Sequence, residues 1–307
     1  MLKNVGSGLL ISIIVLGAFL VVKTVFAGTS STDTQVVVGN ADPSVDSVTL
    51  NSGNVITLTP NATTTIYVNA TISDSNGCAD VFTNGSVEIL VYRSGVTSSS
   101  CSSAQDNINC YKATVFTEND CAAGTSGNAT SVADIYYFAD ATDASSSYAA
   151  QNWIATVIAT DQSAGTNALD SSGVELNILN AINVATSAID YGTVSAGSDT
   201  GATNEETDVT NAGNSTTTLQ VSAVAALTSG SNSIATGSQH YATSSFTFNT
   251  DDHALTDSAI TVGDFTLTSP TSTEYVSSTL FWGIEIPGGT ATGTYAGING
   301  FDALFQN

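Results

Sequence analysis

The sequence predicts an all-β protein made of two β-sandwiches in tandem. Short runs rich in Val, Ile, Thr and Tyr alternate apolar and polar residues from residue 45 onward, which is the period of a half-buried strand. Clusters of Asn, Asp, Ser and Gly separate the runs, and no stretch after residue 28 keeps the apolar period of a capped amphipathic helix. The chain has 307 residues, 42% of them hydrophobic, so each of two domains can bury a core of its own.

The first 27 residues predict a signal peptide. Lys3 precedes an apolar run of 15 residues, and Val25-Phe26-Ala27 fits the small-x-small pattern before a cleavage point. A retained membrane anchor is the alternative, but a spanning helix needs about 18–20 apolar residues. We therefore expect an exported chain, secreted or held at the cell surface, with no stable membrane span after cleavage. Residues 28–44 are expected to form a flexible leader or a short edge strand, because Ser, Thr, Asp and Gly surround the valines at 36–38.

Residues 45–180 are predicted to form the first sandwich. Its many short strand-like runs suit an immunoglobulin-like sandwich, in which two sheets bury the inward-facing residues between them. Aromatic residues such as Tyr148 and Trp153 are predicted to pack in the core or on a sheet face, with a carbohydrate-stacking platform as the alternative. The predicted strands cover residues 47–50, 55–60, 64–73, 86–93, 111–116, 132–139, 152–160 and 173–179.

All four cysteines lie in this first sandwich, and an even number in an exported chain predicts disulfides. If three successive strands run up, down and up, Cys78 and Cys121 occupy loops at one end, while Cys101 and Cys110 flank the loop at the other. Because a disulfide needs Cα atoms about 4.4–6.8 Å apart, this geometry favours Cys78–Cys121 and Cys101–Cys110. A zinc site is a poor competitor, since the cysteine window has no C-x-x-C pair and no His.

The same topology predicts a candidate calcium site. One loop carries Asp74, Asn76 and Asp80, and a second loop expected at the same end carries Glu118 and Asp120. Hard oxygen ligands of this kind are those that Ca²⁺ prefers. The first loop lacks the full D-x-D-x-D-G spacing, however, and Asp-Asn-Gly loops are also ordinary turns. Calcium is the one cofactor that the sequence raises.

Residues 181–307 are predicted to form the second sandwich. Tyr191-Gly192-Thr193-Val194, Gly197 and the run from Val209 to Asn214 resemble a motif of bacterial and archaeal surface modules similar to the PapD-like and Hydin-type immunoglobulin-like sandwiches. Residues 286–297 look like the V-P-x-G-T hairpin that closes many exported sandwich domains. The resemblance implies a fold and a cell-surface setting, with no activity attached. The predicted strands cover residues 207–213, 216–227, 241–249, 259–268, 278–287 and 293–304.

Charge and motifs argue against nucleic-acid binding and catalysis. The chain has 27 Asp and Glu against four Lys and Arg, for a net charge of −23, so it should repel nucleic acid and attract cations. The chain has two histidines, His240 and His253, and His253 follows Asp251 and Asp252, but in so serine-rich a chain a Ser-His-Asp combination arises by chance. Glu205 and Glu206 are expected in a Gly-rich loop, a poor place for the two fixed acids of a glycosidase.

These observations predict a non-enzymatic structural or adhesive protein of a prokaryotic cell surface, whose partners are other surface proteins or glycans. One alternative is a carbohydrate-binding accessory module that uses Trp153 or Trp282, although both are also expected in the core. Another is a filament subunit that self-assembles by donating the leader as an extra strand to a neighbouring copy.

Overall fold

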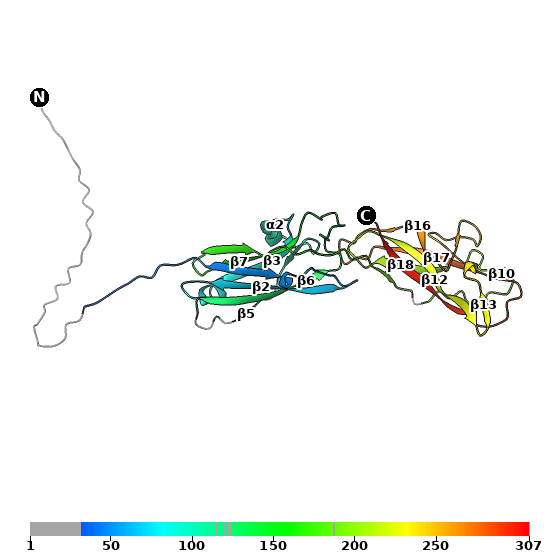
Figure 1. The fold of residues 1–307 in the computed structure, drawn as a ribbon, viewed down its shortest axis with the longest axis horizontal. Coiled ribbons are helices and arrows are strands. Elements are labelled where there is room, and N and C mark those ends of the chain that lie inside the picture. Colours follow the sequence, from blue (N-terminus) through cyan, green and yellow to red (C-terminus); the bar gives the residue numbers. More distant parts are fainter. Residues whose placement is uncertain (1–31, 114–115, 120, 122–123, 187, 307) are drawn as a thin grey trace, which may run out of the picture. The chain divides into compact units, whose positions relative to one another are not determined.

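The computed structural model describes residues 32–113, 116–119, 121, 124–186 and 188–306 (Figure 1). The predicted signal peptide and Asp120 therefore lie outside the described residues. Residues Asn40–Asn307 form one compact unit and residues 1–39 form another. From residue 32 to residue 43 the chain has no regular secondary structure, and Val36, Val37 and Val38 are 78–84% exposed. Across the described part of the chain, no helix has the length and apolarity needed to cross a membrane.

The first sandwich consists of two antiparallel sheets that share one core, so the all-β prediction is confirmed here. Figure 1 shows β3 and β7 in one layer and β2, β5 and β6 in the other. One sheet has the order β1 (Ser44–Leu50), β2 (Thr63–Ser73), β6 (Ser126–Tyr136) and β5 (Phe116–Asn119). The other has the order β4 (Cys110–Lys112), β3 (Ser86–Arg93), β7 (Trp153–Thr160) and β8 (Thr166–Asp170).

Period-two burial along these strands explains the core. In β2, Ile66, Val68, Ala70 and Ile72 are buried while the residues that alternate with them are not. They face Trp153 and Val157 of β7, which belong to the same buried cluster. Each sheet therefore buries one face against the other.

The structure of the first sandwich differs from the prediction in several places. The run 111–116 is split between β4, which pairs with β3, and β5, which pairs with β6, because the chain crosses here from one sheet to the other. The runs 55–60 and 173–179 contribute only isolated bridges, in which Ile56 and Leu176 close the core instead of extending a sheet. Three short helical segments also lie in the connections: η1 (Asn51–Gly53), α1 (Ala79–Phe82) and α2 (Ser98–Ser103). The strand β8 was not predicted.

Both predicted disulfides are present. Cys78–Cys121 joins Cα atoms 5.8 Å apart, and Cys101–Cys110 joins Cα atoms 5.4 Å apart. All four cysteines are buried. Cys78 immediately precedes α1 and Cys101 lies within α2, so each disulfide holds a helix too short to be stable alone.

The second sandwich also consists of two sheets. One has the order β15 (His253–Ala254), β14 (Gln239–Ala242), β17 (Ser277–Ile286), β11 (Glu205–Asn211) and β9 (Ile182–Val184), with β10 (Ser198–Asp199) on β17. In the other, β12 (Thr217–Ser229) pairs with β13 (Asn232–Ile234), β16 (Ile260–Leu267) and β18 (Ala296–Phe305). A short helical turn, η2 (Thr236–Ser238), precedes β14. The core is centred on Trp282, with Leu219, Phe265 and Leu280 around it.

The predicted N-A-G-N turn links β11 to β12 and also contacts the first sandwich. The side chain of Asn214 accepts a hydrogen bond from Leu179 N at 2.6 Å and donates one to Ala139 O at 2.9 Å. Gly213 is needed because a Cβ there would lie 1.9 Å from Leu179 O. A buried amide and a close backbone contact therefore connect the two sandwiches.

Candidate functional site

Three carboxylates gather at the end of the first sandwich where β2 and β7 finish. Ligand oxygens of Asp74, Asp80 and Asp161 all lie within 4.8 Å of one another, and these residues are called the acidic cluster below. Asp74 directly follows β2, Asp80 lies in α1, and Asp161 directly follows β7. The pairing of Ser86 with Thr160 brings the loop before β3 beside the end of β7. The antiparallel register, rather than the sequence spacing, thus assembles the acidic cluster.

Two members of the acidic cluster are almost completely buried: Asp74 is 2% exposed and Asp161 is 3% exposed. Asp74 Oδ1 accepts a hydrogen bond from Asn76 N at 2.7 Å, whereas the buried Oδ2 has no hydrogen-bond partner among the residues that the structure describes. Burying an ionised carboxylate without a full set of partners costs free energy. A ligand bound to Asp74 Oδ2 would lower that cost.

Asp161 has partners on both oxygens. Its Oδ2 accepts from Asn40 Nδ2 at 2.9 Å, and its Oδ1 accepts from Gly165 N at 2.8 Å. The Asn40 amide and the backbone N–H groups of Gly165 and Ser163 hold the pKa of Asp161 below its ordinary value, against the opposing effect of burial. Asp161 is therefore an anion at neutral pH.

The acidic cluster has no side-chain cation to neutralise it. Among the described residues the lysine and arginine side chains are those of Arg93 and Lys112. The Arg93 guanidinium is 3.0 Å from Asp140, and Lys112 Nζ is 3.1 Å from Glu88. Ca²⁺ binds oxygen at about 2.3–2.6 Å, so oxygens across the ion are about 4.6–5.2 Å apart, which the spacing of the acidic cluster fits.

The structure brings together only part of the predicted calcium set. Asp74 and Asp80 belong to the acidic cluster, and Asn76 braces the loop between them. Glu118 lies in β5, opposite Ala129, and is not a member of the acidic cluster. Asp120 is outside the described residues. Asp161 was missed because an aspartate after a strand reads as an ordinary turn residue, and its partners lie far away in the sequence.

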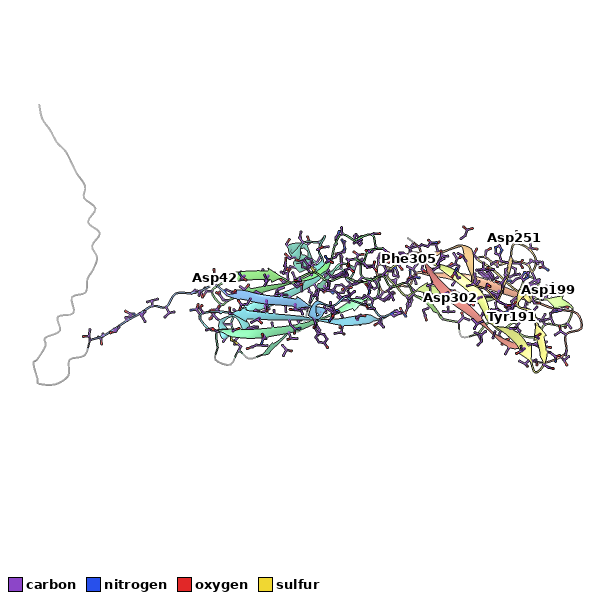
Figure 2. All side chains as sticks on the ribbon, viewed as in Figure 1. Asp42, Tyr191, Asp199, Asp251, Asp302 and Phe305 are labelled. Atoms are coloured by element: carbon purple, nitrogen blue, oxygen red, sulfur yellow. A yellow bond between two sulfur atoms is a disulfide. The ribbon has the colours of Figure 1, made fainter. Side chains whose placement is uncertain are left out.

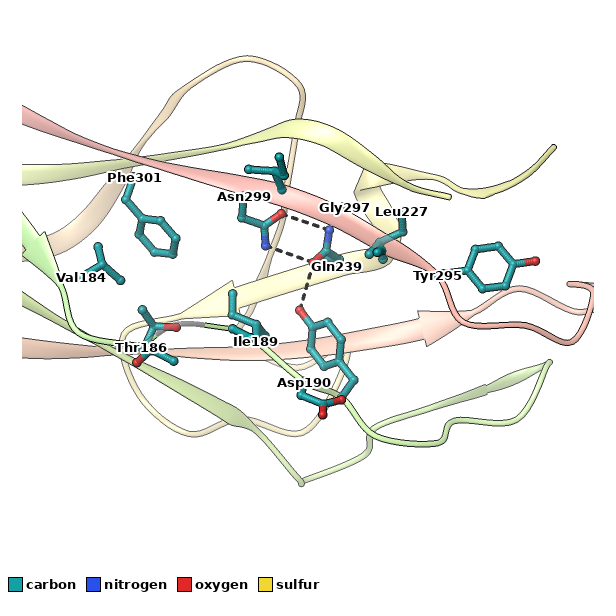
Figure 3. Close-up of a pocket in the computed structure, with 15 residues that line it drawn as sticks. Val184, Thr186, Ile189, Asp190, Leu227, Gln239, Tyr295, Gly297, Asn299 and Phe301 are labelled. Carbon is teal, nitrogen blue, oxygen red and sulfur yellow. Dashed lines mark hydrogen bonds between the residues drawn. The ribbon is translucent and has the colours of Figure 1, made fainter. Parts of the chain in front are cut away.

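A second feature is a groove along the edge of the second sandwich (Figure 3). It has a volume of about 580 Å³ and lies between β18 and residues 184–191. We call it the edge groove. Figure 3 shows the polar network inside it: Gln239 and Asn299 exchange hydrogen bonds of 3.3 and 3.1 Å, and Tyr191 Oη donates to Gln239 at 3.2 Å. The apolar lining includes Val184, Ile189, Leu227, Ile298 and Phe301.

One edge of β18 has no strand partner within the described residues. β18 pairs with β12 alone, and β9 pairs with β11 over only three residues. The facing edges of the two sheets are thus open along the edge groove. An open strand edge is the feature that strand addition requires.

The tryptophan, histidine and glutamate residues considered as candidates from the sequence lie in the core, on strands or beside a carboxylate. Trp153 and Trp282 are fully buried, so the core prediction is confirmed and neither ring is exposed to a sugar. Nδ1 of His240 lies 3.0 Å from Asp252 Oδ2, while His253 is exposed in β15. Glu205 and Glu206 begin β11 instead of lying in a loop, and as neighbours in a strand they point to opposite faces.

No protein-family model and no curated protein matches the sequence. Among solved structures, the chain is similar to the dimeric latent PorU from Porphyromonas gingivalis, at 12% identity and a TM-score of 0.28. The match covers 88% of this chain and 21% of that one, so the chain spans about a fifth of the length of PorU. The likeness carries no argument about function.

Proposed function

We propose that the chain is an exported, non-enzymatic structural or adhesive component of a prokaryotic cell surface. In this proposal a signal peptide, residues 1–27, precedes two immunoglobulin-like domains, residues 45–180 and 181–307. The observation that carries it is the use of polar side chains on the sheet exteriors. They bond across strands, where catalytic groups would instead converge in a cleft.

The outer face of the β2–β6 pair illustrates this use. Thr65 Oγ1 donates to Asp134 at 2.5 Å, and Thr71 Oγ1 donates to Asn128 at 3.0 Å. In the second sandwich, Thr279 Oγ1 donates to Asp208 at 2.6 Å between β17 and β11. Each cross-strand pair contributes about 0.2–1 kcal/mol, so hydroxyls and carboxylates stabilise the sheets from outside. Such a surface needs few lysines or arginines, in keeping with the composition.

The two disulfides support an oxidising compartment, because structural disulfides persist outside the cytosol. The test is to express residues 1–307 with a C-terminal tag in a bacterial host and to analyse cytosol, envelope and medium. We expect protein in the envelope or medium whose mass shows loss of residues 1–27 and of four thiol hydrogens. Retention in the cytosol with four alkylatable thiols would contradict the proposal.

A second candidate function, assembly into a filament, is favoured by the edge groove. The occupant would be the leader of a second copy, with residues 34–39 adding a strand to the open edge of β18. Val36, Val37 and Val38 are the exposed apolar residues of this segment, and residues 34–39 carry no charge. A neutral segment suits the edge groove of a chain with a net charge of −23, because an acidic one would be repelled.

Light scattering during size-exclusion chromatography of residues 28–307 tests this second candidate. We expect concentration-dependent oligomers that disappear in the double variant Val36→Asp/Val38→Asp, whose alternate side chains share one face of an added strand. Val55→Asp, which alters an exposed valine in the first sandwich, is the matched control and should still assemble. A monomeric parent chain at all concentrations would remove this candidate.

A further inference from the structure

Among the described residues, the buried Oδ2 of Asp74 has no hydrogen-bond partner, and it lies beside the acidic cluster. One carboxylate oxygen from each of Asp74, Asp80 and Asp161 lies within 4.8 Å of the other two. Three carboxylates at this spacing repel one another, and burial strengthens the repulsion by excluding water. A bound divalent cation would offset two of the three negative charges and could provide Asp74 Oδ2 with a partner.

A fourth carboxylate, that of Asp42, lies near Asp161 and belongs to the segment that precedes β1. A Cβ built on Gly165 would lie 2.4 Å from Asp42 Oδ1 and 2.6 Å from Asp161 Oδ2, so the two oxygens are at most about 5 Å apart. Any side chain at position 165 would occupy the space into which both oxygens point. Figure 2 shows Asp42 at the end of the first sandwich, just before β1.

The residues on either side of this point are hydrogen-bonded to the acidic cluster and its loop. Asn40 Nδ2 donates to Asp161 Oδ2 at 2.9 Å, and Ala41 N donates to Asn76 Oδ1 at 2.7 Å. Two residues after Asp42, β1 begins, where Ser44 pairs with Ser73. Residues 40–42 therefore lie against the two loops that carry Asp74 and Asp161.

The geometry points to a Ca²⁺ site formed by Asp42, Asp74, Asp80 and Asp161, in which the ion fastens the 40–42 segment to the end of the first sandwich. The donor set consists of oxygen atoms, the ligands of Ca²⁺, and the adjacent Cys78 sulfur is held in a disulfide. Four carboxylates from three segments, the residues before β1, the β2–β3 connection and the loop after β7, suit the larger and more adaptable coordination shell of Ca²⁺ better than the strict octahedron of Mg²⁺. This site is independent of the cell-surface function proposed above.

The expected consequence is that bound Ca²⁺ restricts the motion of residues 40–42, which lead into the first sandwich. With the ion bound, Asp42 is attracted to the site, and the Asn40 and Ala41 hydrogen bonds are maintained. Without the ion, Asp42 is repelled by the nearby Asp161 carboxylate, and the 40–42 segment opens more often. Calcium would thereby stiffen the connection between the leader and the sandwich.

Calorimetry and hydrogen exchange of residues 28–307 test the proposal, with Ca²⁺ or Mg²⁺ as the probe. We expect saturable Ca²⁺ binding at one site, weaker binding of Mg²⁺, and slower exchange of the Ala41 amide when Ca²⁺ is present. Asp74→Asn and Asp161→Asn should abolish measurable binding. Asp42→Asn should weaken it at least about tenfold, the cost seen even for residues that merely orient a ligand, and should remove the protection of Ala41.

Asp46→Asn is the matched control, because Asp46 is an exposed aspartate of β1 that bonds to Ser44 outside the acidic cluster. Its affinity for Ca²⁺ should equal that of the parent chain. The proposal is overturned by the absence of Ca²⁺ binding, or by equal binding of Mg²⁺. It is also overturned if Asp42→Asn leaves both the affinity and the exchange of Ala41 unchanged.

Discussion

Two carboxylates of the first sandwich, the partly buried Asp140 and the buried Asp74, have opposite surroundings. Asp140 Oδ2 lies 3.0 Å from Arg93 Nε, and the Arg93 guanidinium packs 3.7 Å from the centroid of the Tyr148 ring. Gln151 also accepts a hydrogen bond from Arg93. Asp74 Oδ2, by contrast, has no hydrogen-bond partner in the described part of the chain, and Asp74 lies close to the carboxylates of Asp80 and Asp161.

The Asp140 carboxylate is thus paired with a cation of the chain itself, and we propose that a bound Ca²⁺ performs this role for Asp74. Burial raises the pKa of Asp140, and Arg93 opposes that rise with its charge and its hydrogen bond. The chain beyond the leader has just two basic side chains, and the second, Lys112, is paired with Glu88. The Asp140–Arg93 pair should therefore contribute the same stability with or without Ca²⁺. The contribution of the acidic cluster should instead depend on the Ca²⁺ concentration.

The largest expected effect comes from removing the internal cation. Arg93→Met should lower the free energy of unfolding by about 3–5 kcal/mol, because it leaves the largely buried carboxylate of Asp140 without its cation. Urea denaturation at neutral pH measures this change. The control is Lys112→Met, which removes a half-exposed ion pair worth about 0–1 kcal/mol. Equal losses in the two variants would contradict the contrast between buried and exposed pairs.

The two disulfides provide the next comparison, since one adjoins the acidic cluster and the other does not. Removing either bond should cost about 2–4 kcal/mol. Cys78–Cys121 closes a separation of 43 residues and Cys101–Cys110 one of 9, so chain entropy makes the first bond worth about 1.4 kcal/mol more. Urea denaturation of the two double-alanine variants measures the difference. If C101A/C110A were the less stable variant, loop entropy would not explain the stabilisation.

A buried polar group that is neutral and fully paired should have an intermediate effect. Asn214→Ala leaves Leu179 N and Ala139 O without their partner at the contact between the sandwiches, and should cost about 1–3 kcal/mol. The exposed Asn54→Ala serves as the control and should change stability by about 0.5 kcal/mol or less. Thermal unfolding of both variants tests whether the contact contributes to stability.

The smallest effect should also change sign with the solution. In calcium-free buffer, Asp74→Asn should raise the free energy of unfolding by about 1 kcal/mol, because one buried charge is removed and an amide can donate to neighbouring carboxylates. In excess calcium the same variant should be the less stable, since it loses the bound ion. Melting temperatures in EGTA and in Ca²⁺ measure both. Identical shifts in the two buffers would mean that no ion acts there.

Much of the fold could be predicted from local patterns. The run 64–73 lies within β2 (Thr63–Ser73), because every second residue of a half-buried strand is apolar whatever its partner. The disulfide pairing followed from strand direction alone. The prediction of one strand over residues 111–116 was wrong, because a crossing between two sheets does not change the local alternation of apolar and polar residues.

The candidate site was only half predictable for the same reason. Asp74, Asn76 and Asp80 share one loop, so their proximity is visible in the sequence. Asp161 meets Asn40, a residue 121 positions away, because the start of β1 lies beside the ends of β2 and β7.

The sequence by itself determined that this chain is β-rich, acidic and cross-linked by two disulfides, because composition and short-range periodicity are local properties. Tertiary structure alone decided which carboxylates meet, which of them has a cation and which sheet edge stays open. Those outcomes depend on the register of strands far apart in the chain, and burial then sets how strongly each charge requires a partner.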